Sequence, residues 1–166
     1  IHPDKGAHLA IEVARQSGRS LLIAGIIQDK AYFREQVEPY LDDGQIRYIG
    51  SVDVPGKNEL FARARALLHL NTIPERFGLV LAEANAAGVP VIAMDLGSCG
   101  EVIEDGRTGF LVNNVKQAVQ ALQKLPEIDR TACRDRDQLR VSLDTMVDGY
   151  ERVYDKIFDH ETKQRS

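Results

Sequence analysis

Apolar residues fall in short runs that alternate with amphipathic stretches along most of this chain. The runs predict buried strands at residues 21–24, 45–49, 66–70, 89–93 and 109–112. Between them, apolar side chains at helical spacing predict helices at residues 7–16, 29–41, 55–65 and 77–87. Strands that alternate with helices form parallel sheets with helices on both faces. The pattern therefore predicts an α/β fold with a Rossmann-like, doubly wound parallel sheet.

The chain after residue 112 shows no further strand pattern and predicts a helical C-terminal tail. Helices are expected at residues 115–125, 127–139 and 143–158. The last of these has an apolar stripe from Met146 to Ile157, which needs burial against the sheet or against a neighbouring domain. The polar residues 161–166 are expected to be disordered. We thus expect one domain over residues 1–160, which suits a length of 166 residues.

Charge and composition exclude several functional classes. The chain has 21 Lys and Arg against 25 Asp and Glu, a net charge of −4, and no basic cluster that would bind a nucleic-acid backbone. Its two cysteines, Cys99 and Cys133, have no CxxC spacing, so neither a disulfide framework nor a zinc site is expected. No apolar run is long enough for a transmembrane segment, and the first residues form no signal-peptide pattern. We expect a cytoplasmic protein, free or peripheral at the membrane surface.

Glu83 is the only charged residue between Phe77 and Met94. An ionised carboxylate is rarely buried without a partner, because removing it from water costs several kcal/mol. Glu83 therefore binds a ligand, pairs with an Arg or Lys, or lies at the rim of the core in contact with water.

Glu75 lies just before a predicted helix. The amides of Phe77, Gly78 and Leu79 have no partners within a helix that begins here, so they form a favourable site for an anion. Gly78 also lets a ligand approach the backbone closely. Glu75 is thus either part of a ligand site or a carboxylate that stabilises its own helix.

Lys5 and Gly6 lie in a second turn at a helix start, where the helix of residues 7–16 begins. A lysine here can offer its charge to a phosphate while the helix amides bind the phosphate oxygens. The alternative is an ordinary turn in solvent. His8 and His69 lie in apolar patterns, so we expect both to be packed or hydrogen-bonded in the core.

Together these segments resemble the retaining nucleotide-sugar glycosyltransferases of the GT-B fold known as family 4, or group 1, and in particular their C-terminal, donor-binding half. The most specific match is the pair Glu75 and Glu83, separated by seven residues and followed by the Gly-Val-Pro-Val-Ile turn at 88–92. Supporting matches are HPDKG at 2–6, LLIAG at 21–25, YIGSV at 48–52 and GSCGEVIEDGRTGFLV at 97–112. The resemblance covers nearly the whole chain. It implies transfer of a hexose from a UDP- or GDP-hexose to an acceptor with retention of configuration.

The resemblance assigns roles to particular positions. It implies that Lys5 binds the diphosphate and that Glu83 accepts hydrogen bonds from the ribose hydroxyls. Glu75 would contact hydroxyls of the donor sugar, so Lys5 and Glu75 are the expected catalytic residues. The other expected contacts are Gly6 in the turn, backbone near Gly25 and Val52 at the base, and the amides of Phe77, Gly78 and Leu79.

Neither a metal ion nor another cofactor is expected. Lys5 and the helix N-terminus would stabilise the negative charge on the diphosphate leaving group. The triplet Asp135-Arg136-Asp137 has the DxD spacing of metal sites in another glycosyltransferase fold, but it lies in a charged, helix-like stretch rather than after a strand.

The chain also departs from the family pattern. The family has a first strand, central in the sheet and ending in Gly-Arg, before a segment like residues 1–3, and an N-terminal half that supplies most of the acceptor site. Both are absent from this sequence, so the missing N-terminal domain is an expected partner. We expect this chain alone to bind the sugar donor without transferring the sugar. Arg76 stands where the family often has a small residue, which leaves the geometry around the donor sugar open.

Two other functions share part of this pattern. A non-catalytic nucleotide-binding or regulatory module would need Lys5 and Glu83 but not Glu75. A dinucleotide-dependent oxidoreductase would need a G-x-G-x-x-G motif after the first strand, and the sequence has none. The residues therefore favour the glycosyltransferase.

Overall fold

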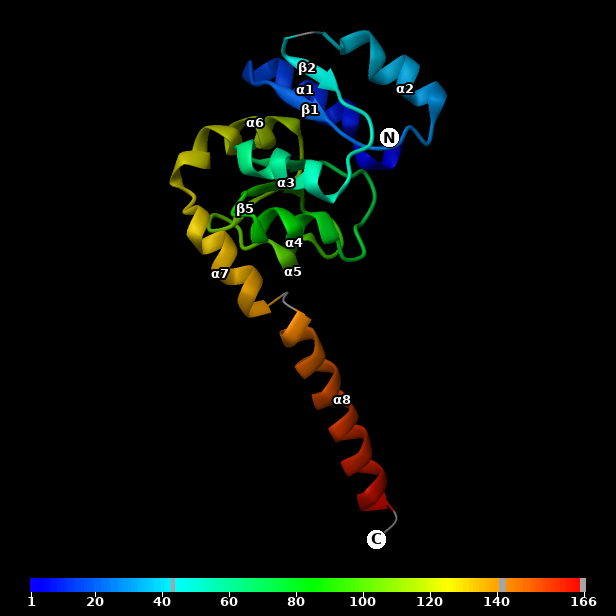
Figure 1. Cartoon of the computed structure of the whole chain (residues 1–166), viewed down its shortest axis with the longest axis vertical. Helices are drawn as coiled ribbons and strands as arrows, with labels where there is room; N and C mark the ends of the chain where they lie inside the picture. Colours follow the sequence, from blue (N-terminus) through cyan, green and yellow to red (C-terminus); the bar gives the residue numbers. More distant parts are fainter. Residues whose placement is uncertain (43, 141–142, 165–166) are drawn as a thin grey trace.

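The computed structural model describes the backbone of residues 1–42, 44–140 and 143–164 and the side chains of residues 1–42, 44–135 and 144–158. The strands are β1 (Leu21–Ile23), β2 (Ile46–Tyr48), β3 (Leu67–His69), β4 (Val91–Met94) and β5 (Gly109–Val112). The α-helices are α1 (Ala7–Ser17), α2 (Lys30–Gln36), α3 (Val54–Arg63), α4 (Leu79–Ala86), α5 (Cys99–Val102), α6 (Val115–Lys124), α7 (Arg130–Arg140) and α8 (Leu143–Gln164). Short 3-10 helices are η1 (Pro3–Lys5), η2 (Glu38–Tyr40) and η3 (Leu125–Glu127). The predicted strands and helices are present in the predicted order, and the α/β class is confirmed (Figure 1).

The strands form two parallel sheets. β1 pairs with β2, and β3, β4 and β5 pair in that order in a second sheet. In the second sheet Ala93 of β4 lies beside His69 of β3 and Leu111 of β5. Because β1 and β3 do not pair within the described residues, the single sheet expected from the sequence is divided between them. The additional central strand implied by the family resemblance stays a prediction.

Helices cover both faces of the sheet formed by β3, β4 and β5. Along β4, Val91 and Ala93 point into a core shared with α3, α4 and α5, whereas Ile92 points into a core shared with α1 and α6. This alternation is the period of two expected for a strand that is buried on both faces.

Among the described residues, the sheet of β1 and β2 has a buried apolar cluster on one of its faces. Ile23 and Ile46 pack there against α1 and α2, while Leu22 on the opposite face is 43% exposed. α1 joins the two sheets, because its Ile11 packs in the core of the first sheet and its Val13 in the core of the second. The turn that precedes α1 is thereby fixed between them.

Two helices are shorter than their sequence patterns predict. The pattern at residues 29–41 is α2 followed by η2, because Pro39 has no amide hydrogen and cannot continue an α-helix. α4 begins at Leu79 rather than Phe77, because Gly78 is its N-cap and has a φ of 75°. Phe77 and Gly78 consequently lie in the loop in front of α4.

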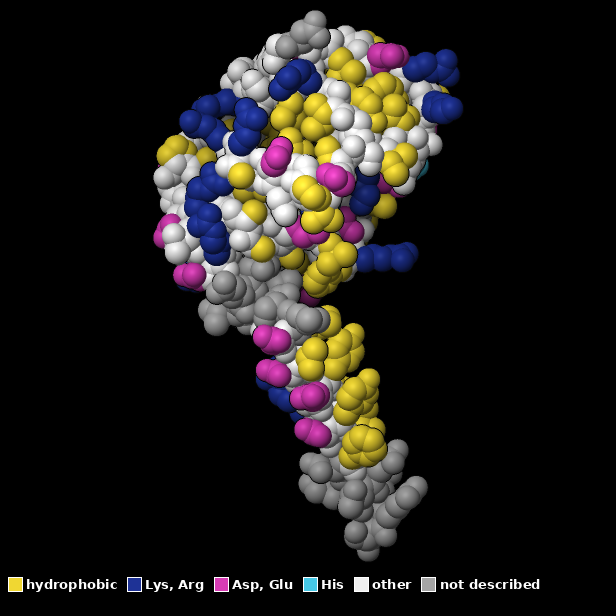
Figure 2. All heavy atoms as spheres, in the orientation of Figure 1, with side chains coloured by type: hydrophobic (Ala, Val, Ile, Leu, Met, Phe, Trp, Pro, Cys, Tyr) yellow, Lys and Arg dark blue, Asp and Glu magenta, His cyan; other side chains and the backbone are white. Residues whose placement is uncertain are grey.

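α8 extends away from the body of the molecule and contacts it through α7 (Figure 1). Figure 2 shows apolar side chains along one side of α8 and acidic side chains along another. Met146, Tyr150, Val153 and Ile157 on the apolar side are each at least half exposed. Of the two expected locations for this stripe, burial against the sheet is therefore wrong, and burial against a neighbouring domain stays a prediction.

The last helix is longer than its apolar pattern predicts. α8 continues to Gln164 and includes residues 161–164, which the sequence predicts to be disordered. Residues 165 and 166 lie outside the described ranges. None of the described helices combines the length and the apolar character needed to cross a membrane.

Candidate active site

The turn η1 and the loop between β3 and α4 meet at the candidate site. The amide of Thr72 donates a hydrogen bond to the carbonyl of Asp4 at 2.9 Å. Gly6 has a φ of 64°, and a Cβ atom at this position would lie 1.8 Å from the carbonyl oxygen of Leu70. Only glycine allows this approach, which brings the neighbouring Lys5 to the loop that follows β3.

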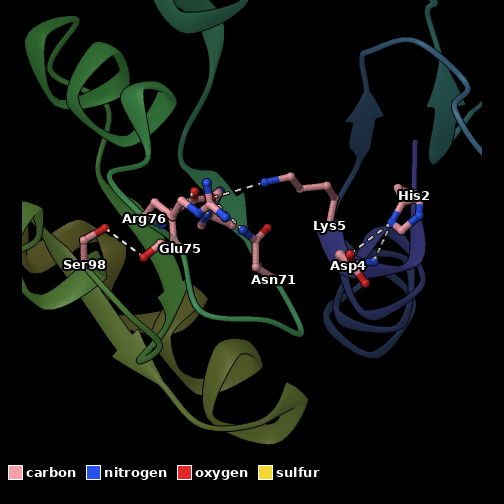
Figure 3. A network of polar contacts seen from close by, with 8 residues as sticks. His2, Asp4, Lys5, Asn71, Glu75, Arg76 and Ser98 are labelled. Atoms are coloured by element: carbon pink, nitrogen blue, oxygen red, sulfur yellow. Dashed lines mark hydrogen bonds and ion pairs between the residues drawn. The ribbon is translucent and has the colours of Figure 1, made fainter.

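The carboxylate of Glu75 is the centre of the site (Figure 3). Its Oε2 accepts hydrogen bonds from Asn71 Nδ2 at 2.7 Å and from Lys5 Nζ at 3.2 Å. The same oxygen lies 3.1 Å from Nε2 of His69. Its Oε1 accepts a hydrogen bond from the amide of Arg76 at 3.1 Å. The structure thus joins Lys5 and Glu75, the two expected catalytic residues, in one ion pair.

The backbone of Glu75 is held as firmly as its side chain. Its carbonyl oxygen accepts hydrogen bonds from the amide of Ser98 at 2.9 Å and from the Ser98 hydroxyl at 3.2 Å (Figure 3). A Cβ atom at Gly97 would lie 2.1 Å from the same carbonyl oxygen. The loop after β4 therefore fixes the position of Glu75, and it needs glycine at residue 97 to do so.

Burial and neighbouring charges act in opposite directions on the pKa values in this cluster. Burial lowers the pKa of His69, although the Glu75 carboxylate raises it. Burial raises the pKa of Glu75. The Arg76 amide, Lys5 and His69 together lower this pKa by more than burial raises it, so the net shift is downward. The two downward shifts favour an ionised carboxylate beside a neutral imidazole, and Nε2 must carry the proton for its contact with Oε2 to be a hydrogen bond.

The amino end of α4 lies beside Glu75 and is open to solvent. The N-cap residue, Gly78, has no side chain that could cap the helix. The neighbouring Phe77 and Leu79 are 49% and 69% exposed. A Cβ atom at Gly78 would lie 3.1 Å from Cγ of Glu75. The positive end of the helix dipole thus faces the space next to the Glu75 carboxylate, where an anionic group is stabilised.

Glu83, in the second turn of α4, is part of a different contact. Its Oε1 lies 2.5 Å from Nζ of Lys57 in α3, and its side chain is 42% exposed. The sequence alone allows three explanations for Glu83. Two of them, a lysine partner and a position at the rim of the core, match what the structure shows. The pair borders an open cavity of about 710 Å³ between α3, α4 and α7, which Arg130 and Arg134 also line.

The two positions expected to contact a base lie in the loops after β1 and β2. The amide of Gly25 donates to the carbonyl of Gly50 at 2.8 Å, and the carbonyl of Gly25 accepts from the Tyr48 hydroxyl at 2.7 Å. Val52 follows Gly50 by two residues. The two loops are therefore neighbours, while their contact with a base stays a prediction.

Sequence reasoning assigned no part in the site to His69, Asn71 or Ser98. The expectation that His69 is packed or hydrogen-bonded in the core is confirmed, since it is 8% exposed, but its partner is the predicted site residue Glu75. His8 is hydrogen-bonded too, at 2.7 Å to the Tyr32 hydroxyl. The signal that was available is position: His69 ends β3, and Asn71 and Ser98 follow β3 and β4. Ligands of parallel sheets bind at this edge.

The DxD triplet and the two cysteines have no expected role in the site. The triplet of residues 135–137 lies in α7, and the side chains of Arg136 and Asp137 are outside the described ranges. Among the side chains that the structure describes, no three or more His, Cys, Asp and Glu are grouped as a metal site. Cys99 and Cys133 are free and buried, and burial raises the pKa of each thiol.

Comparison with known proteins identifies the family. The family model described as glycosyl transferases group 1 matches residues 1–138, a range that includes Lys5, Glu75 and Glu83. The chain belongs to this family. Among curated group 1 relatives, the phosphatidyl-myo-inositol mannosyltransferase of Mycobacterium leprae is 40% identical over 92 residues, which are 55% of this chain and 24% of that protein.

Solved structures show that this group 1 chain shares its fold with other glycosyltransferases. AviGT4, a glycosyltransferase involved in avilamycin A biosynthesis, superposes with a TM-score of 0.79 at 24% identity over 96% of this chain and 49% of that chain. Anabaena HepE in complex with UDP and glucose superposes with a TM-score of 0.71 at 21% identity over 96% of this chain and 46% of that chain. The group 1 chain spans less than half the length of each of these three proteins. The α/β fold and the membership of group 1 that the sequence predicts are confirmed.

Proposed function

We propose that this chain is the donor-binding half of a glycosyltransferase that transfers a hexose from a nucleoside diphosphate sugar to an acceptor with retention of configuration. The observation that carries the proposal is the cluster in which Lys5 and Glu75 meet beside the amino end of α4. A lysine and a helix amino end suit a diphosphate, and a carboxylate suits the hydroxyls of a sugar. The cluster thus offers both kinds of group that a sugar diphosphate needs.

The proposed transfer breaks the bond between the anomeric carbon and the diphosphate oxygen, and both electrons of that bond leave with the diphosphate. The acceptor oxygen bonds to the anomeric carbon, and its proton passes to the departing diphosphate. Lys5 has a side chain that is 55% exposed, so it can turn from Glu75 towards the phosphate. With the amides of α4 it would stabilise the charge on the leaving group, and we propose that no metal ion is needed for this step.

The remaining contacts of the sugar donor follow from the same proposal. Glu75 would accept hydrogen bonds from hydroxyls of the hexose, and Glu83 would accept them from the ribose. Backbone near Gly25 and Val52 would contact the base, and the turn at Gly6 would border the diphosphate. The complex of Anabaena HepE with UDP and glucose supports a UDP-hexose, and the mycobacterial mannosyltransferase supports a mannose donor. A UDP- or GDP-hexose is therefore the proposed substrate.

A second unit would complete the enzyme. Because the chain spans less than half the length of the three proteins compared above, we propose that an N-terminal domain binds the acceptor and closes over the donor. Ile73, Phe77 and Leu79 support this, since their apolar side chains are exposed and lie within four residues of Glu75 in the sequence. This chain alone would then bind the donor and leave the sugar untransferred, because transfer needs a positioned acceptor and the exclusion of water.

Calorimetric titration tests the proposal. The chain is titrated with UDP, GDP and ADP and with their hexose conjugates, with and without EDTA. Glu83→Ala is expected to weaken binding of every bound nucleotide about tenfold or more, because a charge-assisted hydrogen bond to the ribose is lost. Glu75→Ala is expected to weaken only the sugar conjugates. Glu12→Ala, on the exposed side of α1, is the matched control and should change neither.

Three results would count against the proposal or part of it. A folded wild-type chain that binds none of these compounds would contradict a donor site. Equal affinities of wild type and Glu75→Ala for a sugar conjugate would instead favour a nucleotide-binding module without a role in transfer. A loss of binding in EDTA would show that a metal ion takes part.

A further inference from the structure

His69 and Asn71 hold one oxygen of the Glu75 carboxylate, while within the described part of the chain the other oxygen accepts a single hydrogen bond, from the amide of Arg76. We infer that His69, assisted by Asn71, is a positioning residue that orients Glu75 towards one hydroxyl of the donor sugar. The inference rests on the proposed function and extends it to residues that do not touch the sugar. His69 acts on the sugar only through Glu75.

His69 and Asn71 are the fixed members of the cluster. His69 is the last residue of β3, where its backbone lies in register with Ala93 of β4, and it is 8% exposed. Asn71 is 3% exposed. Lys5, by contrast, reaches Glu75 from η1 with a side chain that is 55% exposed (Figure 3). If Lys5 turns to a phosphate, the two buried side chains still hold Oε2 in place.

The two oxygens of the Glu75 carboxylate are engaged unequally. Oε2 has three partners, Lys5, His69 and Asn71, which fills the acceptor capacity of a carboxylate oxygen. Among the described residues, Oε1 accepts only from the amide of Arg76, so it can accept one more hydrogen bond. A sugar hydroxyl bound to Oε1 then meets a carboxylate that cannot rotate. This restricts which hydroxyl can bind and therefore which hexose is accepted.

A neutral imidazole suits this task. A neutral ring donates a hydrogen bond through Nε2–H without cancelling the negative charge that the sugar hydroxyl needs on Glu75. The ionisable groups that face it are Glu75 and Lys5, and burial keeps the pKa of His69 low despite the carboxylate. Any neutral group that donates from the same position should therefore serve, and the side-chain amide of glutamine reaches about as far as Nε2.

The test compares His69→Leu with His69→Gln in the calorimetric titration. For each variant, the affinity for a nucleoside diphosphate alone and for its hexose conjugate is measured at pH 7.5. His69→Leu is expected to lose about tenfold in affinity for the conjugate and less than twofold for the nucleotide. His69→Gln is expected to recover most of that loss, and Asn71→Leu to behave like His69→Leu. His8→Leu, which removes a histidine bonded to Tyr32 instead, is the matched control and should leave both affinities unchanged.

Retained nucleotide binding shows in the same titration that each variant is folded. Equal losses for nucleotide and conjugate, or a His69→Gln variant no better than His69→Leu, would overturn the inference while leaving the donor site intact. Failure of the wild-type chain to bind any conjugate would overturn the proposed function, and this inference with it.

A second measurement covers the case in which His69→Leu does not fold. Nitrogen-15 NMR of the wild-type chain reports the tautomer of His69 directly. The expected result is a neutral ring protonated at Nε2, whose nitrogen shift changes in Glu75→Gln. A ring protonated at Nδ1 alone would overturn the inference, since it could not donate to Oε2.

Discussion

At the scale of single residues, Glu83 has a structural partner in addition to its proposed role in binding the ribose. It stands on an otherwise apolar helix segment, and the structure pairs it with Lys57 at 2.5 Å. A partly exposed ion pair of this kind adds little to stability, because water screens the charges. A pair that contributes little to folding but fixes the direction of a carboxylate is well suited to binding hydroxyls.

Lys57→Met is therefore expected to weaken nucleotide binding several-fold while leaving the melting temperature nearly unchanged. The substitution retains the length of the side chain and removes the charge that orients Glu83. Calorimetry and thermal unfolding of the same sample measure both quantities. Lys30→Met, at an exposed end of α2, serves as the control. A large loss of stability with unchanged binding would show that the pair serves folding instead.

The lowered pKa of His69 makes the free energy of unfolding depend on pH. Its pKa is lowered in the folded chain, so the unfolded chain binds a proton at a higher pH than the folded chain does. The free energy of unfolding should therefore be greatest above the unfolded pKa of about 6.5 and should decrease as the pH falls through and below it. Urea unfolding at pH 7.5, 6.5 and 5.5 measures this decrease. His69→Gln should flatten it, and an unchanged slope in that variant would assign the effect to other groups.

At the scale of elements, Gly6 joins η1 to the end of β3. Gly6→Ala is expected to destabilise the chain by about 3 kcal/mol, because it combines a left-handed backbone with an overlap against the Leu70 carbonyl. Gly18→Ala is the matched control: its φ of 65° is nearly the same, but a Cβ atom there meets nothing within 4 Å. The control should lose only about 1 kcal/mol. Equal losses in urea unfolding would show that the close approach at Gly6 is unimportant.

The existence and order of the elements were predictable from the sequence, whereas the pairing between them was not. Apolar runs such as residues 89–93 mark β4 because both of its faces are buried. The division between β1 and β3 depends on contacts between distant segments, which no local pattern records. The early end of α2 could have been predicted from Pro39, since proline interrupts an α-helix when it stands inside one.

The candidate site was predictable to the same degree. Lys5 and Glu75 were found because a charged residue at a helix start has a known use, and the family resemblance gave each a role. His69 and Asn71 were not found, because a polar residue near a buried strand has many possible partners and only the folded chain selects Glu75. The partners of a functional side chain are thus the part of a site that needs a structure.

At the scale of the whole molecule, α8 should be dispensable for folding. A chain that ends at residue 140 is expected to melt within a few degrees of the full chain, because the described apolar side chains of α8 are largely exposed. Calorimetry measures this, and binding of a dye that fluoresces on apolar surfaces should fall in the shorter chain. Loss of the cooperative transition would show instead that α8 supports the core.

The length of α8 also affects how the molecule moves through water. A helix of 22 residues is about 33 Å long, and most of it extends beyond the body of the molecule (Figure 1). Such a rod adds friction out of proportion to its mass. The chain should therefore elute early from a sizing column and sediment slowly even as a monomer. A mass inferred from elution volume alone would be too high, and light scattering would be needed to tell an elongated monomer from a compact dimer.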